Sequence, residues 1–371
     1  MIDKTPYIQL LRTLVSIPSL SREEDKTAVV LYDFLNRFDL DLRRVGNNII
    51  ARYKSPGSAG ISRDVSGTAD HRTHRPVVLL NSHHDTVKPA TGYSRDPFDP
   101  GEESTRIWGR GSNDAGASLV SLIAVFIHFR NTSLPFDLVL AISAEEECSG
   151  TGGMRMMLPY LGHVDMGIVG EPTSLQVAVG ERGLLVLDCV SHGRSGHAAR
   201  GEGENALYKA LDDISVLRNF RFDRQSVTLG PIGIYVTIIN SGTLHNVIPD
   251  ECRFTVDVRT TDAYTNAETV EIIRERLSSD VSPRSTHLNA SAIDRAHPLV
   301  KAAVSAGSSP FLSPTMSDMA LLPFPTIKIG PGESARSHTS DEYILVSEIE
   351  QGIDRYISLI ENLEREMQKK Y

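Results

Sequence analysis

Short hydrophobic runs alternate with helix-like segments along the first half of this chain. The runs at 77–80, 138–142 and 166–169 are almost wholly apolar, which is typical of strands buried on both faces of a sheet. Between them, Leu119 and Phe126 belong to an apolar series that predicts a buried helix. The pattern therefore predicts an α/β protein whose mixed sheet is flanked by helices.

From residue 184 onward the pattern changes to strand, helix, strand, strand, helix, strand, which is typical of a ferredoxin-like α+β fold. The expected strands cover 184–189, 226–239, 252–259 and about 285–291, and the expected helices cover 205–217 and 267–277. Because this unit interrupts the α/β pattern, we expect it to be an inserted domain.

Polar residues follow the apolar runs directly. His83-His84-Asp85 ends the first run, Glu145-Glu146-Glu147 follows the second, and Glu171 follows the third. Because ligand sites lie at the carboxyl ends of strands in such sheets, these residues are expected at one edge. Imidazole and carboxylate groups suit zinc or a similar divalent ion. A polar strand end or a solvated acidic loop, without any metal, is the alternative for each motif taken alone.

Asp114 and the spacing of His83 and Asp85 add to this argument. Asp114 lies in the turn that enters the buried helix, where it could bind metal or simply cap the helix. On extended backbone His83 and Asp85 point to the same side, so His83 can bind metal while Asp85 orients its ring.

Composition narrows the function classes. A chain of 371 residues predicts two domains, and a formal net charge of −9 argues against nucleic acid as the main partner. Three widely separated cysteines give no disulfide framework, which fits a reducing, cytoplasmic setting. We see no signal-peptide core and no apolar run long enough to cross a bilayer, so no membrane association is expected.

Local signals give three smaller predictions. Ser21 with Glu24, and Ser347 with Glu350, have the spacing of capping boxes at helix starts. The segment 55–75 is rich in Gly, Ser, Asp and Arg, includes His71 and His74, and is expected to be a surface loop.

Four motifs in order, SHHDTV, GRGSNDAG, AEEECSG and GEPTS, resemble the zinc-dependent aminoacylase and carboxypeptidase family, most of all its acetylornithine deacetylases and succinyl-diaminopimelate desuccinylases. The resemblance implies a two-metal aminopeptidase-like catalytic domain at 1–180 and 292–371. It also implies an inserted ferredoxin-like lid and dimerisation domain at 181–291, through which the protein forms a homodimer.

The resemblance also implies roles for the site residues. His83 and Glu171 would hold one metal, Glu147 and His338 the other, and Asp114 would bridge both. Glu146 would be the general base, with Asp85 beside His83. The family usually has Asp where this chain has Glu145, so a Glu145/Glu146 pair stays open as the base and ligand.

Four residues of the expected lid match family positions near the substrate. His197, in SGHAAR, would stabilise the oxyanion from the partner subunit, and Asn246 and Arg259 would hold the amino-acid carboxylate. Arg182 stands where desuccinylases have an arginine near the acyl carboxylate. Each also has a local explanation, as a turn residue or as an exposed residue at a strand end or domain junction.

The expected reaction is hydrolysis of the amide bond of an N-acyl amino acid by two divalent ions, with Zn²⁺ the default and Co²⁺ a common substitute. The expected substrate is N-acetylornithine, or an N-acetyl or N-succinyl citrulline or ornithine, in arginine biosynthesis. Succinyl-diaminopimelate desuccinylase, and a dipeptidase or carboxypeptidase of the same family, are the alternatives. Outside this class we considered a non-catalytic metal-binding protein and a nucleotide-binding protein, whose glycine fingerprint the chain does not match.

Overall fold

The computed structural model describes residues 2–53 and 75–369, which form two compact units. The first contains Met1–Val179, Ile293–Phe311 and Ser317–Tyr371, and the second contains Gly180–Ala292 and Leu312–Met316. The short segment Leu312–Met316 was not part of the expected insertion. The surface loop predicted at 55–75 lies outside the described residues except for Arg75.

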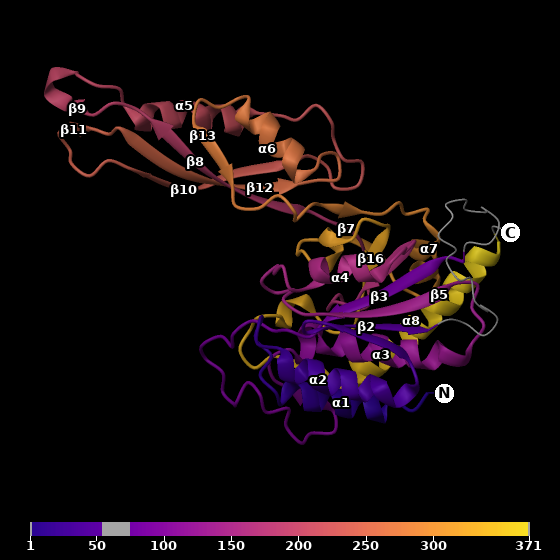
Figure 1. Ribbon diagram of the computed structural model, residues 1–371. Helices are drawn as coiled ribbons and strands as arrows, with labels where there is room; N and C mark the ends of the chain where they lie inside the picture. Colours follow the sequence, from indigo (N-terminus) through magenta and orange to yellow (C-terminus); the bar gives the residue numbers. More distant parts are fainter. Residues whose placement is uncertain (1, 54–74, 370–371) are drawn as a thin grey trace. The chain divides into compact units, whose positions relative to one another are not determined.

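A nine-stranded mixed sheet contains most of the strands of the first unit, and its strand β14 comes from the second (Figure 1). Along the sheet the strands are β1 (Asp41–Val45), β2 (Asn48–Tyr53), β5 (Asp137–Ser143), β3 (Val77–His83), β6 (Met166–Val169), β16 (Thr326–Lys328), β7 (Val177–Glu181) and β14 (Ser291–Ala292), with β15 (Pro310–Ser313) also on β7. The central strands β5, β3, β6 and β16 run parallel, whereas β1, β2, β7 and β14 pair antiparallel with their neighbours. A separate pair joins β4 (Arg106–Trp108) to β17 (Tyr343–Leu345).

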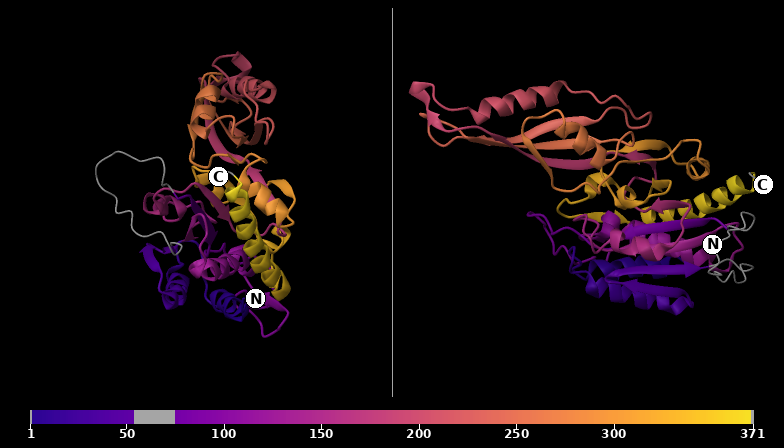
Figure 2. Two further views of the ribbon diagram at one scale, coloured as in Figure 1. Left: turned by 90° about the vertical axis from the view of Figure 1, so that its right-hand side faces the viewer. Right: turned by 45° about the horizontal axis from the view of Figure 1, so that its top comes forward.

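Successive residues of the central strands enter two different apolar layers, because side chains alternate along a strand. Val78 and Leu80 of β3 belong to the larger cluster, with α1, α2, α3 and α8, whereas Leu79 packs with α4. Figure 1 shows α1–α3 on one face and α4 on the other, and Figure 2 shows α8 beside α3. The helices of this unit are α1 (Thr5–Val15), α2 (Asp25–Leu35), α3 (Ala117–His128), α4 (Met154–Leu161), α7 (Pro298–Ser305) and α8 (Val346–Gln368). Burial of the sheet on both faces explains the almost uninterrupted apolar strands.

One expectation from the sequence was wrong for the helical segment that includes Asp114. Within the described residues, Ser112–Asn131 is long and apolar enough to cross a membrane, contrary to our reading of the apolar runs. Its most apolar window is 94% buried inside the protein, so its hydrophobicity is explained by the core.

The second unit has the predicted ferredoxin-like pattern. Its four antiparallel strands lie in the order β10 (Gly233–Ser241), β12 (Glu251–Thr260), β8 (Gly183–His192) and β13 (Asp280–Pro283). Helices α5 (Ala206–Asn219) and α6 (Asn266–Arg274) share one apolar cluster with one face of this sheet. A small pair, β9 (Gly196–His197) with β11 (Val247–Ile248), completes the unit.

Two strand predictions in this unit were wrong in position. The strand expected from residue 226 begins only at Gly233, because residues 226–230 form a turn closed by the Ser226–Gly230 bridge. The strand expected at 285–291 is β13, Asp280–Pro283, and Ser291 instead pairs with Glu181 in the main sheet.

Both predicted capping boxes were wrong. The Ser21 hydroxyl donates to Asp85 instead of capping α2, and α2 has no side-chain cap. Helix α8 begins one residue before Ser347, and the Glu348 carboxylate accepts from the Leu345 amide at 2.9 Å. The spacing was right in both cases, but the Ser21 hydroxyl has another partner and Ser347 lies inside α8.

Candidate metal centre

Three neighbouring parallel strands bring the polar motifs to one edge of the sheet. Strand β3 lies between β5 and β6, with His83 opposite Ser143 and Asn81 opposite Val169. The residues that follow each strand, including Glu146, Glu147 and Glu171, therefore leave the sheet at the same edge as His83.

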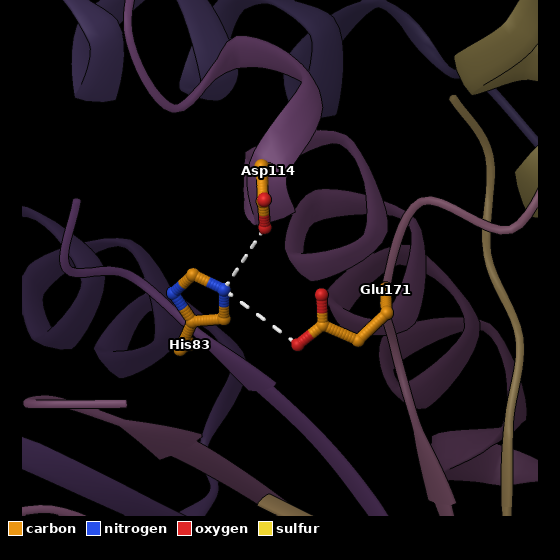
Figure 3. A group of neighbouring side chains, drawn as sticks. All are labelled: His83, Asp114 and Glu171. Carbon is orange, nitrogen blue, oxygen red and sulfur yellow. Dashed lines mark ion pairs between the residues drawn. The ribbon is translucent and has the colours of Figure 1, made fainter. Parts of the chain in front are cut away.

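His83, Asp114 and Glu171 form the first of two triads (Figure 3). The His83 Nε2 atom lies 3.4 Å from an Asp114 oxygen and 3.7 Å from a Glu171 oxygen. This nitrogen is buried and makes no hydrogen bond to the described residues. The separations exceed the roughly 2.9 Å of a hydrogen bond, but they suit ligands sharing one ion at about 2.0–2.2 Å each. The donor set therefore fits a divalent cation.

Asp114, Glu147 and His338 form the second triad. His338 Nε2 lies 2.9 Å from a Glu147 oxygen and 3.6 Å from the Asp114 oxygen that faces away from His83. Asp114 thus turns one oxygen toward each triad, which is the arrangement that a bridging carboxylate requires. All five sequence-predicted ligands are brought together in this way.

Crowding of carboxylates perturbs the titration of the cluster. Burial alone would lower the pKa of His83, but Asp114, Asp85 and the negative charge of Glu146 raise that pKa well above the ordinary histidine value. Burial raises the pKa of Glu171 well above its ordinary value, and the charge of Asp114 adds to the rise. Burial also raises the pKa of Glu146, although His83 opposes the rise. Without a cation the cluster therefore retains protons, which a bound cation would displace.

Asp85 supports both sides of the cluster. Its main-chain oxygen accepts from His83 Nδ1 at 2.9 Å, whereas its carboxylate lies 3.5 Å from that nitrogen. The carboxylate accepts instead from the amides of Glu146 and Glu147, at 3.0 and 3.2 Å, and from the Ser21 hydroxyl at 2.7 Å. Asp85 therefore fixes the His83 ring through its backbone and the glutamate turn through its side chain.

Glu145 is turned away from the cluster. Its backbone has φ +52°, and its carboxylate accepts from the Gly152 amide at 3.1 Å. A Cβ atom added at Gly150 or Gly152 would lie 1.9 or 2.2 Å from the Glu145 carboxylate oxygens, so these glycines make room for it. Glu146, by contrast, lies 3.9 Å from His83 Nε2. This favours Glu146 as the base and Glu147 as the ligand over the Glu145/Glu146 pair.

Three buried charged residues next to the ligands had been given no role from the sequence. Arg110 and Glu342 form an ion pair of 2.7 Å beside the Asp114 turn. Asp318 accepts from the Ser143 hydroxyl, and burial raises the pKa of Asp318 to about 6. Only the position of Glu342, four residues after His338, could have suggested a role.

The four predicted substrate residues belong to the second unit and make local contacts there. His197 Nδ1 accepts from the Ala199 amide, and the main-chain oxygen of Asn246 accepts from the Ala198 amide. Arg259 makes two hydrogen bonds to Asp257, at 2.8 and 3.0 Å, and Arg182 donates to the carbonyls of Leu229 and Pro231. Their roles toward substrate remain predictions.

Comparison with known sequences gives one family and several relatives. The sequence model of one protein family, described as peptidase family M20/M25/M40, matches residues 79–362 of this chain. A succinyl-diaminopimelate desuccinylase of Paracoccus denitrificans is 28% identical over 290 residues, covering 73% of this chain and 72% of that protein. A probable carboxypeptidase of Neosartorya fischeri is 30% identical over 293 residues, covering 74% of this chain and 65% of that protein.

Solved structures share the fold over nearly the whole chain. A tripeptidase from Staphylococcus aureus superposes with a TM-score of 0.73 at 18% identity, covering 98% of this chain and all of that one. A dinuclear metal binding peptidase of the M20 family from Bacillus subtilis gives a TM-score of 0.67 at 18% identity, covering 96% of each chain. At these identities the likeness establishes the architecture: a mixed sheet with helices and a separate antiparallel sheet.

Proposed function

The chain belongs to the peptidase family M20/M25/M40, and on that premise we propose that it is a two-metal hydrolase of N-acyl amino acids. The observation that carries the proposal is the pair of triads that share Asp114, one with His83 and Glu171 and the other with Glu147 and His338. The dinuclear peptidase from Bacillus subtilis, which has the same architecture, supports two ions rather than one.

The proposed mechanism assigns the proton transfers to Glu146. Two zinc ions, or cobalt in their place, would supply Lewis acidity that lowers the pKa of water and polarises the scissile carbonyl. Glu146 belongs to neither triad yet lies 3.9 Å from His83 Nε2, so its carboxylate is free to take a proton from the attacking water. It then returns the proton to the leaving amine nitrogen.

The second unit would select the substrate. We propose that His197 donates to the developing oxyanion from the partner subunit, while Asn246 and Arg259 hold the amino-acid carboxylate. Arg259 already binds the Asp257 carboxylate through two parallel hydrogen bonds, which is the geometry that a substrate carboxylate would use. Arg182 would favour an acidic acyl group.

Among substrates we propose N-acetylornithine, or an N-acetyl or N-succinyl citrulline or ornithine, of arginine biosynthesis. Two alternatives have support from relatives. The Paracoccus relative favours succinyl-diaminopimelate, and the Neosartorya relative favours a carboxypeptidase or dipeptidase reaction.

The decisive experiment is a panel of N-acetyl amino acids, N-succinyl amino acids and dipeptides, assayed with the zinc-loaded and cobalt-loaded protein. We expect hydrolysis of one N-acyl class and loss of it in Glu146→Gln, which controls for contaminating hydrolases. Hydrolysis of dipeptides alone would favour the peptidase alternative, and no hydrolysis of any member by the metal-loaded protein would contradict the proposal.

We also propose a homodimer through the second unit. Strand β10 is the edge of its sheet, and it exposes Tyr235, Ile238 and Ile239, while the neighbouring helix α5 exposes Tyr208 and Leu211. An apolar edge strand with unpaired backbone groups is a template for pairing with a second strand. A second copy of the chain would cover this surface.

A further inference from the structure

Glu342 lies completely buried beside the turn that carries the bridging ligand. One carboxylate oxygen accepts three backbone hydrogen bonds, from Gly111 at 3.1 Å and from Asn113 and Asp114 at 3.0 Å each. The main-chain oxygen of Glu342 accepts a fourth, from the Gly109 amide at 2.8 Å. A single residue thus fixes the backbone of the whole turn up to Asp114.

Arg110 connects this carboxylate to the other ligand-bearing loop. One guanidinium nitrogen donates to the second Glu342 oxygen at 2.7 Å, and the other donates to the Thr339 carbonyl at 3.2 Å. Thr339 follows His338 directly, and Arg110 is only 2% exposed. The Arg110–Glu342 pair therefore ties the Asp114 turn to the His338 loop, which are more than two hundred residues apart in sequence.

The Asn113 side chain makes a second connection between the same segments. Its amide nitrogen donates to the Glu333 carbonyl at 3.0 Å, and its oxygen accepts from the Glu333 amide at 3.0 Å. This pairing holds the start of the loop that leads to His338. Both ends of that loop are therefore anchored to the Asp114 turn.

We infer that Glu342 is a positioning residue that sets the geometry of the second metal position, because it holds Asp114 and His338 in fixed positions relative to each other. The inference rests on the dinuclear site of the proposed function. Residues that orient ligands typically contribute a factor of about 10–100 to metal affinity. The Glu342 carboxylate binds the backbone amide of Asp114, so it would act on the ligands through the backbone and through Arg110.

The two metal positions should depend on Glu342 unequally. His83 is the last residue of β3 and Glu171 lies two residues after β6, and the pairing of these strands holds them independently of Glu342. In the second triad, both Asp114 and His338 lie on segments anchored by the Arg110–Glu342 pair. Loss of the Glu342 carboxylate should therefore weaken the second metal position more than the first.

The test compares cobalt binding to the full chain of wild type, Glu342→Gln and a matched control, Asp213→Asn. Asp213 is a buried carboxylate of the second unit that accepts from the Ser278 and Ser279 amides, at 3.0 and 2.8 Å. It therefore controls for loss of a buried, amide-bound charge as such. Calorimetry would give stoichiometry and affinity, and cobalt d–d absorption would report coordination geometry.

We expect Glu342→Gln to bind the second cobalt equivalent at least about tenfold more weakly, with a changed absorption spectrum and a nearly unchanged first equivalent. Asp213→Asn should lower thermal stability yet bind both equivalents as wild type does. If Glu342→Gln does not fold, Glu342→Asp, which keeps the charge but shortens the side chain, replaces it with the same criteria.

Two equivalents bound by the variant with wild-type affinity and spectrum would overturn the positioning role and leave the proposed function intact. Equal weakening in Asp213→Asn would also overturn it, because the effect would then follow from general destabilisation. Failure of the wild type to bind any cobalt would overturn the proposed function itself.

Discussion

At the scale of single residues, Glu146 is distinguished by facing the cluster without joining either triad. We expect Glu146→Gln to lower kcat by a factor of about 10²–10⁴, because the amide cannot accept the proton. Metal content should stay at the wild-type value, measured by elemental analysis. Glu147→Gln is the matched control and should lose metal as well as activity. Near-normal turnover in Glu146→Gln would assign the base elsewhere.

The cluster should also couple cation binding to pH. Neighbouring carboxylates raise the pKa of metal-free His83 well above its ordinary value, so the ring keeps its proton to higher pH than an ordinary histidine does. A cation binds only the neutral ring, so binding releases protons, and affinity falls as pH drops further below that raised pKa. Calorimetry at pH 7 in two buffers of different ionisation enthalpy should give different heats, corresponding to about one or more protons released. Identical heats would show that the ligands were already deprotonated.

Single residues could be assigned from sequence where the backbone alone dictates their place. His83 ends an apolar strand and Glu171 lies two residues after another, so the parallel sheet brings them to one edge whatever their side chains contact. Glu342 could not be assigned, because its importance lies in three amides of a turn distant in sequence. Ser21 was misassigned for the same reason, since its partner is Asp85 rather than its own helix.

At the scale of elements, α6 has the complete capping box that α2 and α8 lack at their predicted positions. The Thr265 hydroxyl accepts from the Glu268 amide at 3.1 Å, and the Glu268 carboxylate accepts from the Thr265 amide at 2.7 Å. We expect Thr265→Ala to lower the free energy of unfolding of the second unit by about 1 kcal/mol. Urea unfolding would measure the loss.

Ser347→Ala provides the comparison, because Ser347 lies inside α8 and does not cap it. That substitution should change the free energy of unfolding by less than about 0.5 kcal/mol. An equal loss in both variants would mean that the hydrogen bonds of the α6 box contribute little.

Hydrophobic periodicity predicted whether most segments form helices or strands, but it did not predict where several of these elements begin and end. The buried strands β3 and β5 were predicted because both of their faces enter apolar layers. The strand expected at 285–291 was misplaced, because pairing with β8 selects Asp280–Pro283. Partner strands, which lie far away in sequence, decide where such short strands begin and end.

At the scale of the whole molecule, the exposed edge of β10 gives the proposed dimer a direct test. Ile238→Lys would place a charge on that apolar edge, where Ile238 is 51% exposed, and should shift the dimer toward monomer. Sedimentation over a range of concentrations would measure the shift. Val29→Lys is the matched control, since Val29 is similarly exposed, at 45%, on α2. Equal sedimentation of all three proteins would exclude this interface.

The way in which the second unit joins the main sheet has one practical consequence. Its chain leaves through β7 and returns through β14, where Gly180 faces Ala292 and Glu181 faces Ser291. Strands so paired can be closed by a hairpin loop of about two residues. If the proposed function holds, a shortened gene that joins them with Asn-Gly should yield a smaller protein that still binds divalent cations but lacks the unit proposed to select the substrate. The same β7–β14 junction would accept the corresponding unit of another protein, so substrate specificity could be exchanged together with that unit.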